Sequence, residues 1–531
     1  MRHILLAGMI SSWILAAQTG PNPASIEGQV VHAGTSAPLK KVSMRLSSGP
    51  TNRTVETDEQ GRFQFTGLAP GRYSLSAQRA GFLAQNYGAR RYNTPGTPIP
   101  VSQNQQVRDI NLRLTPQGVI VGRVLDEDGD PMAYAQVMVF RQMYRNGRKQ
   151  WTQANGSSSS DIGEFRVPNL EPGRYLVAAM FRSPESNTGI EESLPEKAEM
   201  IYGGTYYPNA PTEQAAAPVD VSAGSETRGI EIHMTKAPGF RIRGTVNGIP
   251  RGWAGTTVSL FPADSSWNVV SNTQVQPPGN QFELRGVPSG QYTLTVRMPS
   301  DPGQMTASQP VTVASGNLTG IVLTLSPWFD LPAQVSVAET GNTVNLRNVR
   351  VSLQPVGLVF RSGNLNVPAD ANGRLVFNAL SSGRFTVNVQ DIPDGCFVQH
   401  IKYGGQEVTG DGVEIALPAL LEVVLSSTAA KISGSVMDKD GKPVSQATVA
   451  LIPSDAGAKA ISVTISVTTD DSGNFTAAHL RAGTYRLLAW QDIEPGAYAD
   501  PEFRKPFESG ATEVTVGPSE QQTAQLHAIE Q

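Results

Sequence analysis

The sequence predicts an all-β fold of five tandem β-sandwich domains, and three observations lead to that prediction. A pattern of Gly-x-Phe followed by Leu-x-x-Gly-x-Tyr occurs five times, and its final aromatic residue recurs every 93 to 117 residues. That period matches the length of a whole domain. Within each copy, polar and apolar residues alternate, as they do in strands with one buried face. Glycine (52 residues) and proline (38 residues) are abundant, which fits short strands joined by turns.

The aromatic residue that ends each pattern is expected to plug the core of its own domain, with a polar tip near the sheet rim. In four copies it follows the first glycine of the pattern by 12 residues. Copy four has phenylalanine at this point, so packing is the role that all copies share. The five aromatic residues are Tyr73, Tyr175, Tyr292, Phe385 and Tyr485.

Copy five shows the expected strands and turns most clearly. Aspartate and glycine mark two turns, at residues 438–441 and 470–473, because aspartate bonds its own backbone and glycine accepts positive φ. Alternating segments on either side of these turns predict a sandwich. We expect strands at residues 431–436, 447–451, from 474 onward, 485–489, 513–516 and 523–528.

The same frame sets the expected domain boundaries. A Gly-x-Val opening stands at Gly28, Gly122, Gly244 and Gly434, whereas the most divergent copy, copy four, has Ala333 there. Each copy closes on an apolar strand a few residues before the next copy begins, so we expect an elongated array with restricted bending. The expected sandwiches cover residues 21–116, 117–237, 238–327, 328–427 and 428–531.

The first 20 residues are typical of a secretory signal peptide. Arg2 and His3 precede an apolar stretch at residues 4–17, which ends in the small residues Ala16 and Ala17. The stretch is short for a membrane span. We expect cleavage after Ala17, no span in the mature chain, and a secreted, periplasmic or cell-surface location. An uncleaved anchor is the alternative.

The composition disfavours two classes of partner. Charged residues make up only 17% of the chain and the net charge is -4, so the sequence predicts neither nucleic-acid binding nor a polybasic membrane surface. The single cysteine, Cys396, allows no intramolecular disulfide. We expect it to be a small buried residue of a core.

No catalytic residue, cofactor or metal site is predicted. The six histidines are scattered, and His527 with Glu530 supplies fewer ligands than a zinc site needs. Residues 126–130 hold four carboxylates, for which calcium is one interpretation. A solvated turn is the favoured one, because Asp438 lies at the same point of copy five. The sequence contains no nucleophile elbow, phosphate loop or dinucleotide fingerprint.

The repeated frame reads Gly-x-Val, Asp-x-x-Gly-x-Pro, Ala-x-Val, Asp-x-x-Gly-x-Phe and Leu-x-Pro-Gly-x-Tyr, and it resembles the carboxypeptidase regulatory-like domain. The resemblance is closest in copies one, two and five, and copy four departs furthest from it. It implies an Ig-like or transthyretin-like sandwich, often grouped with carbohydrate-binding-like folds and with B-type repeats of surface adhesins. It also implies an exported bacterial protein without catalytic activity.

Copies one and two carry tyrosine-rich insertions after the aromatic strand. Their loop aromatics are candidates for stacking on sugar rings or gripping a peptide. The alternative is that they cover the edge of their own sandwich. The candidate ligand-binding residues are Tyr87, Tyr92, Tyr202, Tyr206 and Tyr207.

Together these features predict an exported, non-enzymatic protein that acts as a structural spacer or as a binding or adhesion module at the cell envelope. The expected partner is a glycan or an envelope protein. The alternative function is that of a carbohydrate-binding protein that uses the aromatic loops of domains one and two.

Overall fold

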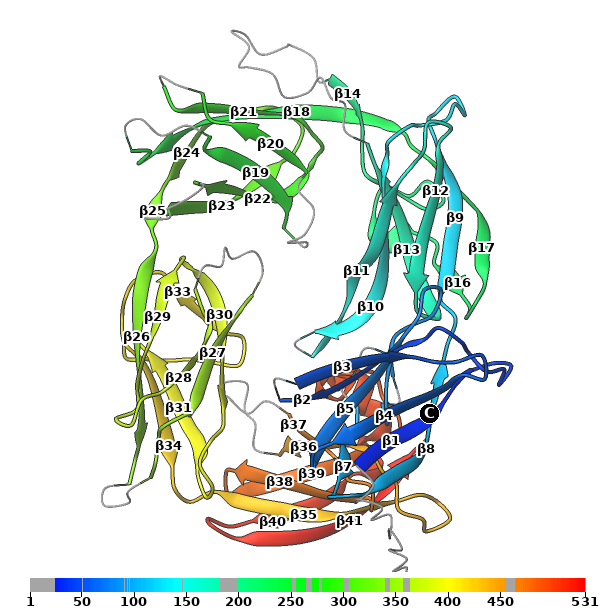
Figure 1. Cartoon of the computed structure of the whole chain (residues 1–531). Helices are drawn as coiled ribbons and strands as arrows, with labels where there is room; N and C mark the ends of the chain where they lie inside the picture. The colour runs from blue at the N-terminus through cyan, green and yellow to red at the C-terminus, as the bar shows by residue number, and fades with distance from the viewer. Residues whose placement is uncertain are drawn as a thin grey trace, which may run out of the picture. The chain divides into compact units, whose positions relative to one another are not determined.

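Figure 1 shows the computed structural model of the chain, which consists almost entirely of strands. The structure describes residues 24–530, apart from residues 50, 90, 93, 95, 146, 182–198, 251–254, 264–269, 277–278, 299–304, 340–343, 357–362 and 455–463. Within these ranges the strands form nine sheets, which confirms the expected all-β sandwich fold. The signal peptide expected at residues 1–20 lies outside them. No helix in these ranges has the length and apolar character that a membrane crossing requires.

The first sandwich encloses one core that includes Ile26, Met44 and Leu75. Its opening strand runs antiparallel to one neighbour and parallel to the closing strand. One sheet has the order β4 (Arg62–Leu68), β1 (Ala24–His32), β8 (Gln106–Leu114), and the other has the order β3 (Thr51–Glu56), β2 (Ser43–Ser48), β5 (Gly71–Gln78), β6 (Gln85–Asn86), with β7 (Ile99–Val101) paired to β5.

The second sandwich buries Val137, Tyr175 and Val177. Its hairpin β10–β11 is the longest of the molecule's described hairpins. One sheet has the order β12 (Glu164–Leu170), β9 (Gly118–Leu125), β17 (Glu226–His233), and the other has the order β11 (Arg148–Ser158), β10 (Gln136–Arg145), β13 (Gly173–Met180), β15 (Thr205–Tyr206), with β16 (Val219–Val221) paired to β13 and a short 3-10 helix η2 (Glu213–Ala215) nearby in sequence.

The third sandwich has a core that includes Ile242, Leu260 and Leu294. Its opening and closing strands again pair in parallel. One sheet has the order β14 (Glu199–Tyr202), β18 (Lys236–Asn247), β21 (Gln281–Val287), with β24 (Leu318–Thr324) paired to β18, and the other has the order β20 (Ser271–Gln274), β19 (Thr257–Pro262), β22 (Gly290–Arg297), β23 (Met305–Val313), β25 (Ser326–Pro327).

The fourth sandwich keeps the same plan despite its divergent sequence. Its core includes Phe377, Phe385 and the single cysteine, Cys396, which is buried as expected. One sheet has the order β29 (Arg374–Leu380), β26 (Phe329–Val337), β34 (Leu421–Ser426), β31 (Phe397–Tyr403), β32 (Gln406–Glu407), and the other has the order β28 (Asn366–Pro368), β27 (Arg350–Pro355), β30 (Gly383–Gln390), β33 (Val413–Ile415).

The fifth sandwich forms one continuous sheet, because β39 and β41 pair where their ends meet. The six strands that the sequence predicts are present, and β37, at residues 465–468, is a seventh that it did not predict. The order is β37 (Ile465–Thr468), β36 (Thr448–Pro453), β39 (Gly483–Trp490), β41 (Gln521–Ile529), β35 (Ala430–Met437), β38 (Asn474–Leu480), with β40 (Thr512–Val516) paired to β39 and a helical segment of η3 (Ala497–Ala499), α1 (Pro501–Arg504) and η4 (Lys505–Gly510) before β40. The boundaries between the five domains stay predictions.

The helical segment of copy five covers a second apolar cluster, which the sequence reasoning did not foresee. Trp490 is fully buried in this cluster beside Leu488 and Ile452. The rings of Phe503 and Phe507 lie 6.1 and 5.9 Å from the Trp490 ring. The outer face of the β36–β39 pair is therefore apolar and covered.

The repeated aspartates hold the turns. In Asp58, Asp370 and Asp470, one carboxylate oxygen accepts the backbone N–H groups two and four residues further on, at 2.7 to 2.9 Å. Asp126 accepts the N–H groups of Asp128 and Asp130 in the same way, at 3.0 and 2.9 Å. The carboxylate cluster at residues 126–130 is thus the expected turn.

The repeated tyrosines are buried and bond the backbone behind them. The hydroxyl groups of Tyr73, Tyr292 and Tyr485 each donate to the carbonyl oxygen four residues earlier, at 2.8 to 2.9 Å. Phe385 fills the same place in copy four and is fully buried. Packing is therefore the common role of this position, as the sequence predicts.

The opening glycines are required by a close approach of two strands. A Cβ atom on Gly28 would lie 1.8 Å from the carbonyl oxygen of Ile110, and one on Gly434 would lie 1.9 Å from that of Ala524. On its other side the opening strand pairs with a strand that places a phenylalanine opposite the glycine. In copy five this strand is β38, and Phe475 lies opposite Gly434. In copy four an alanine, Ala333, replaces the glycine, and the residue opposite it is Leu375, which is smaller than phenylalanine.

We expect Gly434→Ala to destabilise the fifth sandwich by about 1–3 kcal/mol, the usual cost of overpacking a filled core. Hydrogen exchange with mass spectrometry on the full chain should show faster exchange confined to the strands of copy five. The control is Gly510→Ala, because a Cβ atom there would meet nothing within 4 Å. Equal exchange in both variants would contradict the steric account.

Candidate functional site

The insertion of copy one forms a loop whose described residues are held by their own hydrogen bonds. We call residues 85–97 the tyrosine loop. The backbone N–H of Tyr87 donates to Leu75 O at 2.9 Å, and that of Thr97 donates to Tyr87 O at 2.8 Å. The side-chain amide of Asn86 donates to Thr94 O at 2.7 Å. These bonds fix the loop against strand β5 before any ligand arrives.

Two glycines let the tyrosine loop fold back on itself. A Cβ atom on Gly96 would lie 2.3 Å from the carbonyl oxygen of Tyr87. Gly88 has a φ of +74°, and a Cβ atom there would lie 2.7 Å from the Cβ atom of Thr97. Larger residues would clash at both points, so the loop depends on glycine for its shape.

The two candidate tyrosines of copy one lie in this loop, where both are half-buried. Tyr87 packs against the core of the first sandwich. The hydroxyl group of Tyr92 donates to Thr115 Oγ1 at 3.1 Å, which ties the loop to the end of the domain. The structure therefore brings Tyr87 and Tyr92 together on one element.

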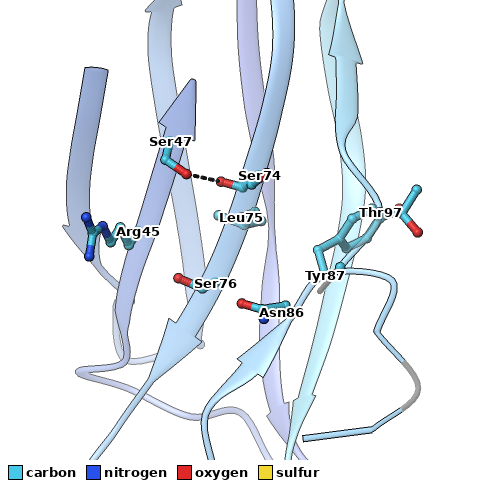
Figure 2. Close-up of a pocket in the computed structure, with 9 residues that line it drawn as sticks. Arg45, Ser47, Ser74, Leu75, Ser76, Asn86, Tyr87 and Thr97 are labelled. Atoms are coloured by element: carbon cyan, nitrogen blue, oxygen red, sulfur yellow. Dashed lines mark hydrogen bonds between the residues drawn. The ribbon is translucent and has the colours of Figure 1, made fainter. Parts of the chain in front are cut away.

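A hollow of about 340 Å³ with a mixed polar and apolar lining lies on the outer face of the β2–β5–β6 sheet, and we call it the sheet-face groove. Figure 2 shows Arg45 on one side of it, Tyr87 and Thr97 on the other, and Ser74, Ser76 and Asn86 between them. Because side chains alternate along a strand, these residues face outward while Met44, Leu46, Tyr73 and Leu75 are buried. The residues that line it are Arg45, Ser47, Ser74, Leu75, Ser76, Asn86, Tyr87, Gly96 and Thr97.

A second hollow of about 270 Å³ lies beside the tyrosine loop, and both Tyr87 and Tyr92 border it. Asn111 and Arg113 of β8 supply polar groups to its floor. Tyr87 therefore borders both hollows. Hydroxyl, amide and guanidinium groups beside an aromatic ring form a surface that can hydrogen-bond and pack against a polar ligand. In the part of the chain that the structure describes, no three His, Cys, Asp or Glu side chains gather in a group that could hold a metal ion.

Tyr202 lies on a different element, strand β14, which pairs with β18. The Lys236 ammonium lies 5.1 Å from the centre of the Tyr202 ring, and Phe181 meets the ring edge-on at 5.9 Å. The Tyr202 hydroxyl also hydrogen-bonds Glu127, which pairs with Lys236 at 2.6 Å. These contacts show that Tyr202 fastens the insertion to β18, the strand that opens copy three.

A buried ionic cluster secures the same strand. The Arg241 guanidinium pairs with Glu199 of β14 and, at 2.9 Å, with Glu283, whose side chain is fully buried. Arg243 and Arg285 approach the same Glu283 carboxylate at 2.6 and 2.8 Å. Removing one partner from such a buried set leaves a charge uncompensated, which is costly. The insertion of copy two therefore serves copy three as well as its own sandwich.

Tyr206 and Tyr207 lie at the edge of strand β13. The Tyr206 ring lies 6.2 Å from Phe140, and the backbone N–H of Tyr207 donates to Val177 O at 2.8 Å. Tyr206 lies against the apolar outer face that Phe140 and Leu176 form, where β10 and β13 pair. This contact favours the edge-covering alternative for Tyr206, and the backbone bond of Tyr207 fastens the chain beside it.

The sequence reasoning missed the strand residues of the sheet-face groove. Arg45, Ser47, Ser74 and Ser76 occupy outward positions of the two strands beside the insertion. A partial signal was present, because Leu176 and Leu488 stand in copies two and five at points where copy one has Ser74 and Ser76. Copies three and four are polar at these points as well, so comparing outward positions would have indicated three faces and not this one alone.

The ion pair beside Tyr202 gives a testable titration. Hydrogen bonds from Lys236, which has the largest effect, from a backbone N–H group and from the Tyr202 hydroxyl lower the pKa of the Glu127 carboxyl to about 2. Because the folded-state pKa lies below the ordinary value, the stability that this contact contributes is fully present above about pH 4.5 and is lost as the pH falls toward 2, where the carboxylate itself becomes protonated. Carbon-detected NMR of glutamate-labelled protein should show this midpoint, and Lys236→Met should return it toward 4.5. An unchanged midpoint in the variant would show that Lys236 is not the cause.

Comparison with known proteins gives matches of low identity over much of the chain. Serine-aspartate repeat-containing protein F of Staphylococcus epidermidis is 21% identical over 408 residues, which are 67% of this chain and 22% of that protein. Colossin-A of Dictyostelium discoideum is 22% identical over 516 residues, 87% of this chain and 4% of that protein. The chain thus spans less than a quarter of the length of either relative.

Solved structures match with low scores. GBS52, the minor pilin of Streptococcus agalactiae, matches with a TM-score of 0.23 and 13% identity, covering 40% of this chain and 97% of that one. Two B repeat units of the collagen binding protein of Staphylococcus aureus match with a TM-score of 0.14 and 12% identity, covering 71% and 92%. The model of the carboxypeptidase regulatory-like domain matches residues 25–115, 119–197 and 431–527, about half of the chain. The chain therefore belongs to the carboxypeptidase regulatory-like domain family.

Proposed function

We propose that this protein is an exported, non-enzymatic multidomain module that acts as a structural spacer or binding module at the bacterial cell envelope. The observation that carries this proposal is the use of the repeated residues inside the fold. The recurring tyrosines, aspartates and glycines fill cores, close turns and admit neighbouring strands. Because the recurring residues are used to build the fold, any recognition of a partner is expected in the segments that differ between copies.

Short, bonded linkers support the spacer role. Three residues separate β8 from β9, and three separate β34 from β35. The first linker bonds back to copy one, since Leu83 N–H donates to Thr115 O at 2.9 Å and Gln117 N–H donates to Gly81 O at 3.0 Å. In the second, Glu339 accepts the N–H of Ser427 at 2.8 Å. A linker tied to the preceding domain bends less than a free one.

The location is tested by fractionating the source bacterium and detecting the protein with an antibody. We expect it in the envelope or the medium, with its N-terminus near residue 18, and sensitive to protease added to intact or outer-membrane-permeabilised cells. Detection of the protein only in the cytoplasm, at full length and protected from protease, would contradict an envelope role.

A carbohydrate-binding function is the second candidate, and the sheet-face groove beside Tyr87 is the observation that favours it. Hydroxyl and amide groups around an aromatic side chain suit the hydroxyl-rich rim and apolar faces of sugar rings.

For that candidate, Tyr87→Ala should weaken binding on a glycan and peptidoglycan array by at least about tenfold while the first sandwich stays folded, with any loss of hydrogen-exchange protection confined to the tyrosine loop. Tyr134→Ala is the matched control, because Tyr134 is 73% exposed on another sandwich. Binding that is unchanged in Tyr87→Ala, or lost equally in both variants, would rule out the groove as the glycan site.

A further inference from the structure

The outer face of the first sandwich carries polar residues in two rows that cross the sheet. Strand register places Thr54, Arg45, Ser76 and Asn86 side by side on β3, β2, β5 and β6. A second row places Asn52, Ser47 and Ser74 beside one another in the same way. Neighbouring strands lie about 4.8 Å apart, so each row presents hydrogen-bonding groups at regular intervals along a flat surface.

The same face is built differently in two other copies. Copy two has Leu176 and Ala178 at the points of Ser74 and Ser76, and Tyr206 covers that region. Copy five has Leu488 at the point of Ser76, under its helical segment, and Arg486 at the point of Ser74. In copy one the insertion does not lie over the face but rises beside it as the tyrosine loop (Figure 2). In copies two and five, then, apolar contacts cover the outer face of this sheet. In copy one the same face carries polar groups.

One side chain gives the sheet-face groove its charge. Arg45 is the charged group among the described residues that line it, and none of those residues is acidic. Its guanidinium donates to a neutral partner, Asn52 Oδ1, at 3.3 Å. A planar guanidinium binds carboxylates with two parallel hydrogen bonds, an arrangement that is stronger and more specific than a neutral contact.

We propose that the sheet-face groove binds an acidic saccharide, with Arg45 receiving a carboxylate of the sugar. The serine and asparagine side chains of the two rows bond its hydroxyl groups, and Tyr87 forms the wall against which a ring packs. This inference rests on the carbohydrate-binding function proposed above and names the ligand class of that site. A loop already held by its own hydrogen bonds loses little freedom when the ligand binds, which favours affinity.

A saccharide fits the groove better than a peptide does. Peptides that bind to sheets usually add a strand at a free edge or insert apolar side chains into pockets. The sheet-face groove lies on a face, and the apolar side chain that lines it, Leu75, is itself 2% exposed. Its remaining lining combines hydroxyl, amide and guanidinium groups with the Tyr87 ring, and together these match the hydrogen-bonding groups and apolar faces of a sugar.

The test is calorimetric titration of the full mature chain with oligogalacturonate and with its methyl ester, which keeps the rings and removes the charge. We expect oligogalacturonate to bind about 10- to 100-fold more tightly, the range expected for hydrogen bonds to a charged group. Arg45→Gln should remove that preference, and added salt should weaken the binding of the acid form alone. Arg53→Gln is the matched control, because Arg53 lies on β3 and donates to the backbone of Thr66 at 2.7 Å.

Three outcomes would overturn the inference. Equal affinity for the acid and the ester, unchanged in Arg45→Gln, would leave a neutral-glycan site and remove the role of Arg45. Binding of neither, and of no other sugar on the array, would remove the carbohydrate function and leave the envelope module. Equal or tighter binding of poly-glutamate that depends on Arg45 would assign the groove to an acidic peptide. Circular dichroism of each variant separates lost binding from lost folding.

Discussion

Each sandwich depends on how closely its opening strand approaches the closing strand. In copies one, two, three and five that approach leaves no room for a side chain, since a Cβ atom on the opening glycine would lie 1.8 to 2.3 Å from a carbonyl oxygen. A phenylalanine from the facing strand covers the bare backbone, as Phe282 covers Gly244. In copy four the opening residue is larger, Ala333, and the residue opposite it is smaller, Leu375 in place of phenylalanine, so the total volume of the pair changes little. In copy one the hairpin turn at residues 58–61 directly precedes β4, the strand that brings the phenylalanine Phe63, and the buried aromatic Tyr73 lies on the next strand, β5.

Function is then left to what lies between the repeated elements. The insertion after the aromatic strand has different contacts in copies one, two and five. In copy one it forms a loop beside a polar face, in copy two it fastens β14 to β18, and in copy five it seals an apolar cluster around Trp490. One scaffold thus supports linkage and covering, and the recognition that we propose for copy one would use the same insertion point beside a polar face.

Sequence patterns predicted the frame well because the frame is local. The Asp–Gly turns and the glycine–aromatic spacing lie within about 15 residues of one another, and period-two alternation reports burial directly. The insertions were harder, because their contacts join residues far apart in the chain. The cluster of Glu199, Arg241 and Glu283 spans more than 80 residues, and no short motif marks it. The groove beside Tyr87 likewise combines β2, β5 and a loop, and the strand residues carry no signal until their outward direction is known.

Aromatic residues that hold the fold differ from those for which we propose recognition, and amide hydrogen exchange of two variants tests that difference. Tyr73 is 8% exposed inside the first core and bonds Ala69 O, whereas Tyr87 is half-buried in the loop. In Tyr73→Ala, protection should fall across the strands of residues 24–114. In Tyr87→Ala, the loss should stay within residues 85–98. A loss of protection across the whole sandwich in both variants would contradict the account, because it would make the loop a part of the core.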